Sequence, residues 1–214
     1  MHGDRLIAID LGGTIEDTWL LKRAWFASRG FQLSSLPLSR AEVIHLIGGN
    51  ETLYVEMVNC IYSDRSILCH SLCVGCEEAL RMIARDYRIS LLSSRPPSQR
   101  DATLRWLHKV GISHLITGLA LIGSDESKLG WCERHDTSIL VDDDIRHLQT
   151  GRGHKQTIRI HYDAGNHRLI PEKSQIVVAS TWAEIVCFLN TLHESSCKMR
   201  LQDARPGVPN NLAV

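Results

Sequence analysis

The chain has 214 residues, of which 43% are hydrophobic and 22% are charged, an ordinary composition for a globular protein. Lys plus Arg and Asp plus Glu both number 24, so no excess of charge attracts the chain to a nucleic acid polymer or a membrane surface. No apolar run approaches the ~18 residues that span a bilayer, and the length suits one α/β core with an insertion, or two small domains.

The beginning of the chain, MHGDRLIAID, predicts a strand over 5–10 that ends in Asp10. These residues lack the apolar core and the cleavage site of a signal peptide. The seven cysteines are placed irregularly, which favours a reducing compartment over a framework of disulfides. We therefore expect a cytoplasmic protein.

Residues 17–75 are helical in pattern and show no strand signal. Three stretches, TWLLKRAWFASRG, SRAEVIHLIGG and NETLYVEMVNCIY, predict helices separated by turns. Because this segment follows the first strand, we expect 17–75 to form a helical cap that covers the carboxyl edge of the sheet.

The stretch CHSLCVGC, which brings together Cys69, His70, Cys73 and Cys76, has two interpretations. Its cysteine spacing is one that holds an iron–sulfur cluster, and with the histidine it offers four soft ligands to zinc. The stretch lies mid-chain, however, without a second knuckle elsewhere. Small buried hydrophobic side chains are the interpretation that this context favours.

Strands and helices alternate over the rest of the chain. The pattern predicts helices over 76–87, 98–111 and 181–193 and strands over 88–94, 138–144, 157–162 and 174–180. This alternation predicts an α/β fold, a Rossmann-like parallel sheet sandwiched by helices, built from residues 1–16 and 76–199. Residues 200–214 have little periodicity and two prolines, so we expect a loose tail.

Polar residues end three of the predicted strands, and in a parallel sheet such ends meet at one edge. The first strand continues into DLGGTIED, where Asp10, Gly13, Thr14 and Asp17 match the first motif of the haloacid dehalogenase-like (HAD) hydrolases, hhhD-x-D-G-T-h-x-D. Three further stretches resemble the second, third and fourth motifs of this family. ISLLSSRP supplies Ser93, SDESKLGWC supplies Lys128, and ILVDDD supplies the pair Asp142 and Asp143. The resemblance covers about residues 5–193 and is greatest to deoxyribonucleotidase-type and related small phosphatases.

The resemblance implies a Mg²⁺-dependent hydrolase that acts on a small phosphorylated metabolite or nucleotide through an aspartyl-phosphate, as a monomer or homodimer. Asp10 is then the nucleophile, Ser93 holds the phosphoryl oxygens and Lys128 supplies positive charge. The implied metal ligands are Asp10, the carbonyl of Gly12, Asp142 and Asp143. The implied substrate-binding residues are Gly12, Gly13, Thr14, Ser94, Arg95 and Asn50.

Each of these residues also has a purely structural interpretation. Asp10 can anchor a loop, Ser93 and Ser94 can form the turn before two prolines, and Lys128 can be a solvated loop lysine. Asn50 is a candidate helix N-cap, and Arg95 can pair with Asp101 rather than with a substrate.

Gly12 departs from the first motif, which has an aspartate there. In the phosphatases of this family that aspartate protonates the leaving oxygen, and losing such a group typically lowers the rate by about 10²–10⁴-fold. Four explanations stay open: a leaving group that needs no acid, substitution by Glu16, phosphonate cleavage with a cap lysine, or a weak catalyst that only binds a phosphorylated ligand. Lys22 is the one lysine of 17–75, and we expect the turn to accept aspartate at position 12.

Overall fold

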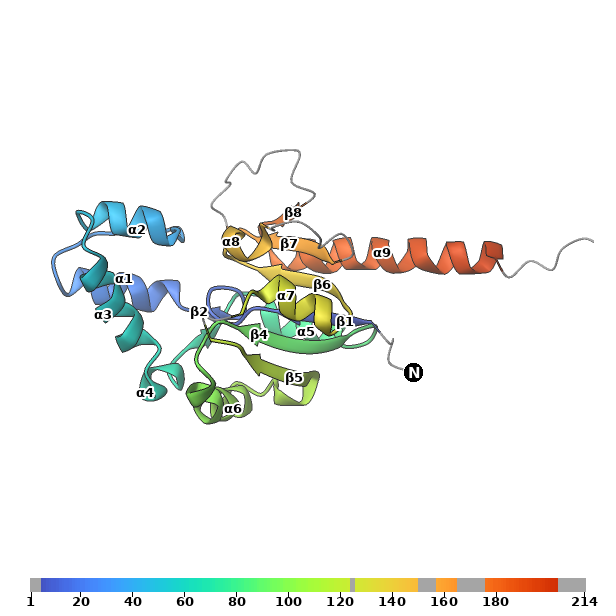
Figure 1. The fold of residues 1–214 in the computed structure, drawn as a ribbon, viewed down its shortest axis with the longest axis horizontal. Helices are drawn as coiled ribbons and strands as arrows, with labels where there is room; N and C mark the ends of the chain where they lie inside the picture. Colours follow the sequence, from blue (N-terminus) through green and yellow to red (C-terminus); the bar gives the residue numbers. More distant parts are fainter. Residues whose placement is uncertain (1–4, 124–125, 150–156, 165–175, 204–214) are drawn as a thin grey trace, which may run out of the picture.

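The computed structural model describes residues 5–123, 126–149, 157–164 and 176–203. In this part of the chain six strands form one parallel sheet: β1 (Leu6–Ile9), β4 (Arg88–Ser93), β5 (Ile116–Leu121), β6 (Thr137–Asp142), β7 (Ile158–Tyr162) and β8 (Ile176–Ala179). Their order across the sheet is β5-β4-β1-β6-β7-β8 (Figure 1). The chain builds outward from β1 to one side, then crosses to β6 and builds outward to the other. This doubly wound order confirms the predicted Rossmann-like fold.

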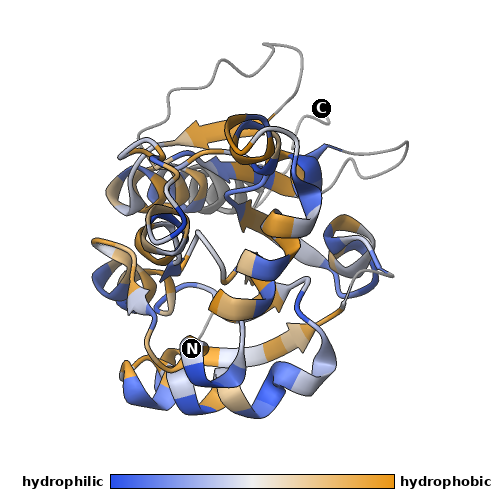
Figure 2. Cartoon of the chain, turned by 90° about the vertical axis from the view of Figure 1, so that its left-hand side faces the viewer, coloured by the Kyte–Doolittle hydropathy of each residue, from blue (hydrophilic) through white to orange (hydrophobic). Residues whose placement is uncertain are grey.

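Helices cover both faces of the sheet, because side chains alternate along the strands. Ile7 and Ile9 of β1 join a hydrophobic cluster with α5 (Cys76–Ile83), α6 (Arg100–Lys109) and α9 (Trp182–Asp203). Ala8 joins a smaller cluster on the other face, with α7 (Lys128–Arg134) and α8 (Ile145–Leu148). Figure 2 shows the strands as mostly hydrophobic, while the helices carry both hydrophobic and hydrophilic residues.

The insertion after β1 forms four helices: α1 (Trp19–Ala27), α2 (Arg40–Leu46), α3 (Glu51–Ile61) and α4 (Asp64–Ile67). The first three share a hydrophobic cluster of their own, which includes Trp19, Phe26, Val43 and Met57. They lie beyond the edge of the sheet where the strands end (Figure 1). Ile67 of α4 belongs instead to the main cluster. The last helix of the predicted cap segment, α4, therefore packs on the core.

Several elements differ from those that the pattern predicted. Two short antiparallel strands, β2 (Glu16–Asp17) and β3 (Ser71–Leu72), close the base of the insertion. The pattern did not predict the edge strand β5, because Gly118 interrupts its apolar run. Glycine occupies this position because a β-carbon there would lie only 2.9 Å from the hydroxyl oxygen of Ser90 on β4. The helix predicted over 181–193 continues to Asp203 and so enters the expected tail. No proline interrupts this helix, because the first proline after residue 193 is at position 206. The rest of that tail, from residue 204, lies outside the described residues.

A buried network of charged side chains joins the insertion to the sheet. Glu16 of β2 is fully buried and accepts hydrogen bonds from both terminal nitrogens of Arg95, which follows β4. The His70 ring, just before β3, lies between this carboxylate (Nδ1 at 2.8 Å) and the carbonyl of Ile61 at the end of α3 (Nε2 at 2.9 Å). Burial acts to raise the pKa of Glu16, but the His70 hydrogen bond and the Arg95 charge outweigh it and hold this pKa below its usual value. The network fixes the end of α3 on the core.

We predict that Glu16→Gln lowers the free energy of unfolding by about 3–5 kcal/mol, because it leaves a buried guanidinium without its carboxylate. Urea denaturation monitored by circular dichroism measures this change. The matched control is Glu77→Gln, which removes the carboxylate of an exposed i,i+4 pair with Arg81 and is expected to change stability by only about 0.3–0.5 kcal/mol.

The loss should also depend on pH. The pKa of Glu16 in the folded protein is below its usual value of 4.5. The charge of Glu16 therefore stabilises the protein above that pH, and this contribution disappears as the pH falls through the folded-state pKa. The difference in stability between wild type and Glu16→Gln should therefore shrink in acid. A difference that stays constant from pH 7 to pH 3 would contradict this account of the network.

Candidate active site

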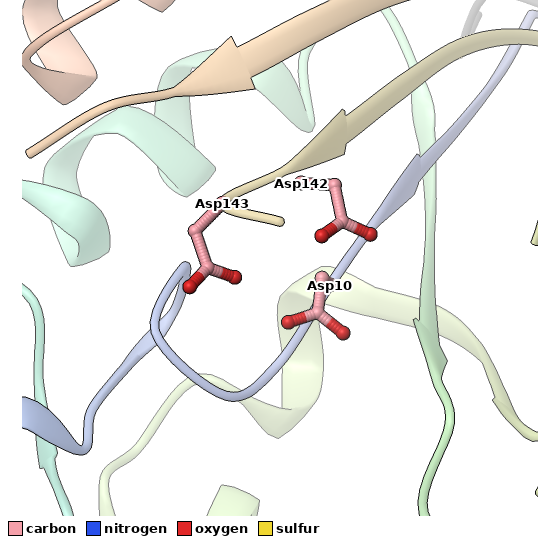
Figure 3. Close-up of side chains that lie close together, drawn as sticks. All are labelled: Asp10, Asp142 and Asp143. Carbon is pink, nitrogen blue, oxygen red and sulfur yellow. The ribbon is translucent and has the colours of Figure 1, made fainter. Parts of the chain in front are cut away.

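Three carboxylates meet at the carboxyl edge of the sheet. Asp10 follows β1, Asp142 ends β6 and Asp143 comes next, and these two strands are paired in parallel. One oxygen of each carboxylate lies within 4.8 Å of the others, and Figure 3 shows the three groups turned toward one another. Two Mg²⁺–oxygen bonds of about 2.1 Å span about 4.2 Å, so the three oxygens lie close to the spacing at which they can share one Mg²⁺.

Lys128 neutralises part of this charge. It is the first residue of α7, a helix rather than the expected loop, and the hydroxyl of Ser127 caps that helix by accepting from the Gly130 amide. The buried Nζ donates to Asp10 Oδ1 at 2.5 Å and to Asp142 Oδ2 at 2.6 Å. Burial acts to lower the pKa of Lys128, but the two carboxylates outweigh it and raise this pKa well above its usual value. The lysine is therefore a fixed cation inside the site, not a solvated loop residue.

The site keeps an excess of negative charge in spite of Lys128. Burial, together with the neighbouring Asp10, raises the pKa of Asp143 to about 7, and burial also raises that of Asp142. The next carboxylate, Asp144, turns away and pairs with Arg146. Three close oxygen ligands with uncompensated charge fit a hard divalent cation such as Mg²⁺.

The loop after β1 is shaped to meet these acids. Gly13 has φ +102°, and a β-carbon there would overlap the Asp143 carboxylate, so only glycine fits. The Thr14 hydroxyl donates to Asp143 Oδ1 and accepts from the Asp143 amide, both at 3.1 Å. The Gly13 amide, expected to face a phosphoryl group, instead donates to the Glu16 carbonyl at 2.9 Å. Thr14 and Gly13 thus support the metal ligands.

A cavity of about 2060 Å³ opens between the sheet edge and the insertion. Its volume exceeds the roughly 300–1,000 Å³ of typical ligand pockets. The predicted residues that line it are Asp10, Gly12, Gly13, Ser93, Ser94, Arg95, Lys128, Asp142 and Asp143. The turn at Gly48 and Gly49 lines the opposite wall, together with Glu51. The sequence motifs therefore converge on one cavity.

Two predicted substrate-binding residues lie elsewhere, and a third is already engaged. The side chain of Asn50 accepts a hydrogen bond from the Leu53 amide at 3.0 Å and so caps α3, which agrees with its alternative interpretation as an N-cap. Asn50 does not line the cavity. Thr14 is fully buried behind Asp143. Arg95 lines the cavity, but its guanidinium pairs with Glu16 and not with Asp101.

Two further residues line the cavity, Lys22 of α1 and Tyr62 at the end of α3. Burial acts to lower the pKa of Lys22, but Tyr62, Tyr54 and the site carboxylates outweigh it and raise this pKa. As the one lysine of 17–75, Lys22 was considered from the sequence only for phosphonate cleavage and not for substrate binding. No sequence pattern marks Tyr62.

The structure does not bring the residues of the described cysteine stretch together as one group of possible metal ligands. Among the described residues, the acidic triad is the group of possible metal ligands that the structure brings together. Cys69 is exposed and Cys76 is buried, and both ring nitrogens of His70 are engaged in the buried network. Burial raises the pKa of Cys73 and of Cys76, which suits neutral thiols rather than thiolate ligands.

No protein-family model matches the chain, and no curated protein matches it. Solved structures do share its fold. A HAD-superfamily hydrolase from Ehrlichia chaffeensis is 16% identical, over 90% of this chain and 98% of that one, with a TM-score of 0.53. YfnB from Bacillus subtilis, a candidate HAD-hydrolase whose structure holds magnesium, is 11% identical over 89% and 100%, with a TM-score of 0.56.

A candidate phosphoglycolate phosphatase from Lactobacillus plantarum is 11% identical over 87% of this chain and 99% of that one, with a TM-score of 0.54. At these identities the likeness shows a common fold. In the described part of the chain, none of the helices combines the length and the apolar character needed to cross a membrane.

We predict that Mg²⁺ stabilises the protein by about 2.7 kcal/mol at a hundredfold excess over its Kd, because it relieves repulsion that the unfolded chain lacks. Thermal unfolding with and without Mg²⁺ measures this effect, and isothermal titration calorimetry gives the Kd. Asp143→Asn should abolish most of the stabilisation. Asp144→Asn, a change in the adjacent carboxylate that pairs with Arg146, should retain it. Equal responses of the two variants would place the cation elsewhere.

Proposed function

We propose that this chain is a HAD-type phosphohydrolase that uses Mg²⁺ to hydrolyse a small phosphorylated metabolite or nucleotide through an aspartyl-phosphate on Asp10. The observation that carries the proposal is the position of Asp10: at the edge of a Rossmann-like sheet, in the cavity wall, hydrogen-bonded to Lys128 and beside two further carboxylates. The shared fold with HAD-superfamily hydrolases supports the same reaction class.

The residues divide the work of phosphoryl transfer between them. A carboxylate oxygen of Asp10 attacks phosphorus as the bond to the leaving oxygen breaks, and water then hydrolyses the aspartyl-phosphate. Lys128 holds the nucleophile in place, and Ser93 and Lys22 line the cavity in which the phosphoryl oxygens of a substrate would lie. Asp10, Asp142 and Asp143 would hold Mg²⁺, which would supply the positive charge that this reaction between anions requires.

Two of the explanations for Gly12 fit the structure poorly. Glu16 is fully buried outside the cavity, and its lowered pKa makes it a poor acid. Phosphonate cleavage through an imine needs a neutral lysine amine. Lys22 does line the cavity, but its raised pKa keeps it protonated. An ammonium group at this position suits the binding of an anionic substrate.

A second candidate function is the binding of a phosphorylated ligand without turnover. The observation that favours it is Gly12, since glycine supplies no proton where the first motif has an aspartate. Both functions require the same metal ligands and the same cavity. They differ only in whether a bond breaks.

The test is a Mg²⁺-dependent screen of the purified protein against phosphomonoesters, nucleotides, acyl phosphates and phosphonates. We expect release of phosphate from at least one phosphate compound. Asp10→Asn should abolish this release, because the nucleophile and a metal ligand are lost together. The control Asp101→Asn changes an exposed carboxylate on α6 and should leave the rate unchanged. Phosphate compounds that bind but are not cleaved would favour the second candidate.

A further inference from the structure

The space beside Gly12 is occupied by a side chain from the insertion. A β-carbon built on Gly12 would lie 2.8 Å from the hydroxyl oxygen of Tyr62 and 3.4 Å from a carbon of its ring. The Tyr62 hydroxyl therefore lies where the missing aspartate side chain would begin. Tyr62 lines the same cavity as Asp10.

The core, and not only the insertion, holds Tyr62 in place. The Arg95 guanidinium lies over its ring, 4.8 Å from the ring centre, and Arg95 is itself fixed by Glu16. The backbone carbonyl of Tyr62 accepts from the Gln99 side chain at 2.7 Å, and its ring meets the His70 ring edge-on at 6.0 Å. Three contacts with residues from other parts of the chain thus direct the hydroxyl toward Gly12.

We propose that the Tyr62 hydroxyl replaces the absent carboxyl group as the proton donor to the leaving oxygen, a role that rests on the phosphohydrolase function proposed above. As the bond from Asp10 to phosphorus forms and the bond to the leaving oxygen breaks, that oxygen takes the hydroxyl proton. In the second half, water attacks phosphorus, its proton returns to the phenolate, and the Asp10 carboxylate leaves. After one turnover the Tyr62 hydroxyl has regained its proton and the Asp10 carboxylate its charge.

The surroundings of the ring favour this exchange. The transient phenolate lies beneath the Arg95 guanidinium, and Lys22 shares the cavity wall. Fixed positive charge stabilises a negative charge that develops during the reaction.

The decisive variant is Tyr62→Phe, which keeps the ring and removes the hydroxyl. Its kcat/KM is compared with that of wild type on alkyl phosphates and on 4-nitrophenyl phosphate. We expect a loss of about 10²–10⁴-fold on the alkyl esters, whose leaving oxygen needs a proton. On 4-nitrophenyl phosphate, whose leaving group is stable as an anion, we expect little change. Tyr87→Phe, the same substitution outside the cavity, should affect neither substrate.

A structural role for Tyr62 would lower the rates on all esters by the same factor, and that result overturns the proposal while the phosphohydrolase function stands. An unchanged rate on alkyl phosphates overturns it in the same way. If wild type cleaves no phosphate compound, 4-nitrophenyl phosphate included, both the function and the role of Tyr62 are wrong.

A double-mutant cycle tests the shared position directly. The sequence predicted that the turn accepts aspartate at position 12, but the structure places the Tyr62 hydroxyl in that space. Gly12→Asp alone should therefore raise alkyl phosphatase activity little, or lower it. In the Tyr62→Phe background the same change has room, and it should recover much of the lost activity. Equal effects of Gly12→Asp in the two backgrounds would show that the residues do not share one position.

Discussion

The repulsion between carboxylates at one edge of the sheet is the constraint around which this protein is organised. Parallel pairing of β1 with β6 brings Asp10 beside Asp142 and Asp143, in a setting where burial makes each charge costly. A buried lysine offsets part of the charge. In the proposed function, the remaining charge would attract a divalent cation, which would bring a carboxylate and a phosphoryl group together.

The insertion completes the site from the other side. Its first three helices have a hydrophobic cluster of their own, so they can cover the sheet edge without sharing its core. The buried pairing of Glu16 with Arg95 and His70 fixes where the insertion begins and where α3 ends. Because Arg95 also packs on the Tyr62 ring, one buried ion pair fixes both the base of the insertion and a wall of the cavity.

Gly12 is the point at which these two halves of the molecule meet. In the first motif of the HAD hydrolases this position carries an acid on the sheet; here a hydroxyl from the insertion reaches the same space. The proposed exchange moves the proton donor from the loop after β1 to the end of α3. Contacts with Arg95 and Gln99 of the core hold the donor there.

The sequence by itself predicted the fold class, because strand periodicity is a local feature. Polar strand ends and the resemblance to the HAD motifs predicted most of the candidate site residues. Alternating strands and helices predicted the parallel sheet, and the motif order predicted Asp10, Ser93, Lys128 and Asp143 at one edge. Local patterns gave incomplete or wrong predictions where contacts with residues distant in the sequence decide the structure. The strand β5 contains a glycine that only the adjacent Ser90 explains, and α7 begins at a lysine whose partners are more than ten residues away.

Only the tertiary structure decided what fills the space at Gly12 and which residues face the cavity. Asn50 and Tyr62 lie at opposite ends of α3, and no periodicity says that the first caps the helix while the second reaches the site. Likewise, Glu16 and Arg95 are 79 positions apart, and the contact that makes one a buried anion and the other its partner arises from packing. Residue types specify what chemistry is available, whereas long-range contacts specify which groups are left free to perform it.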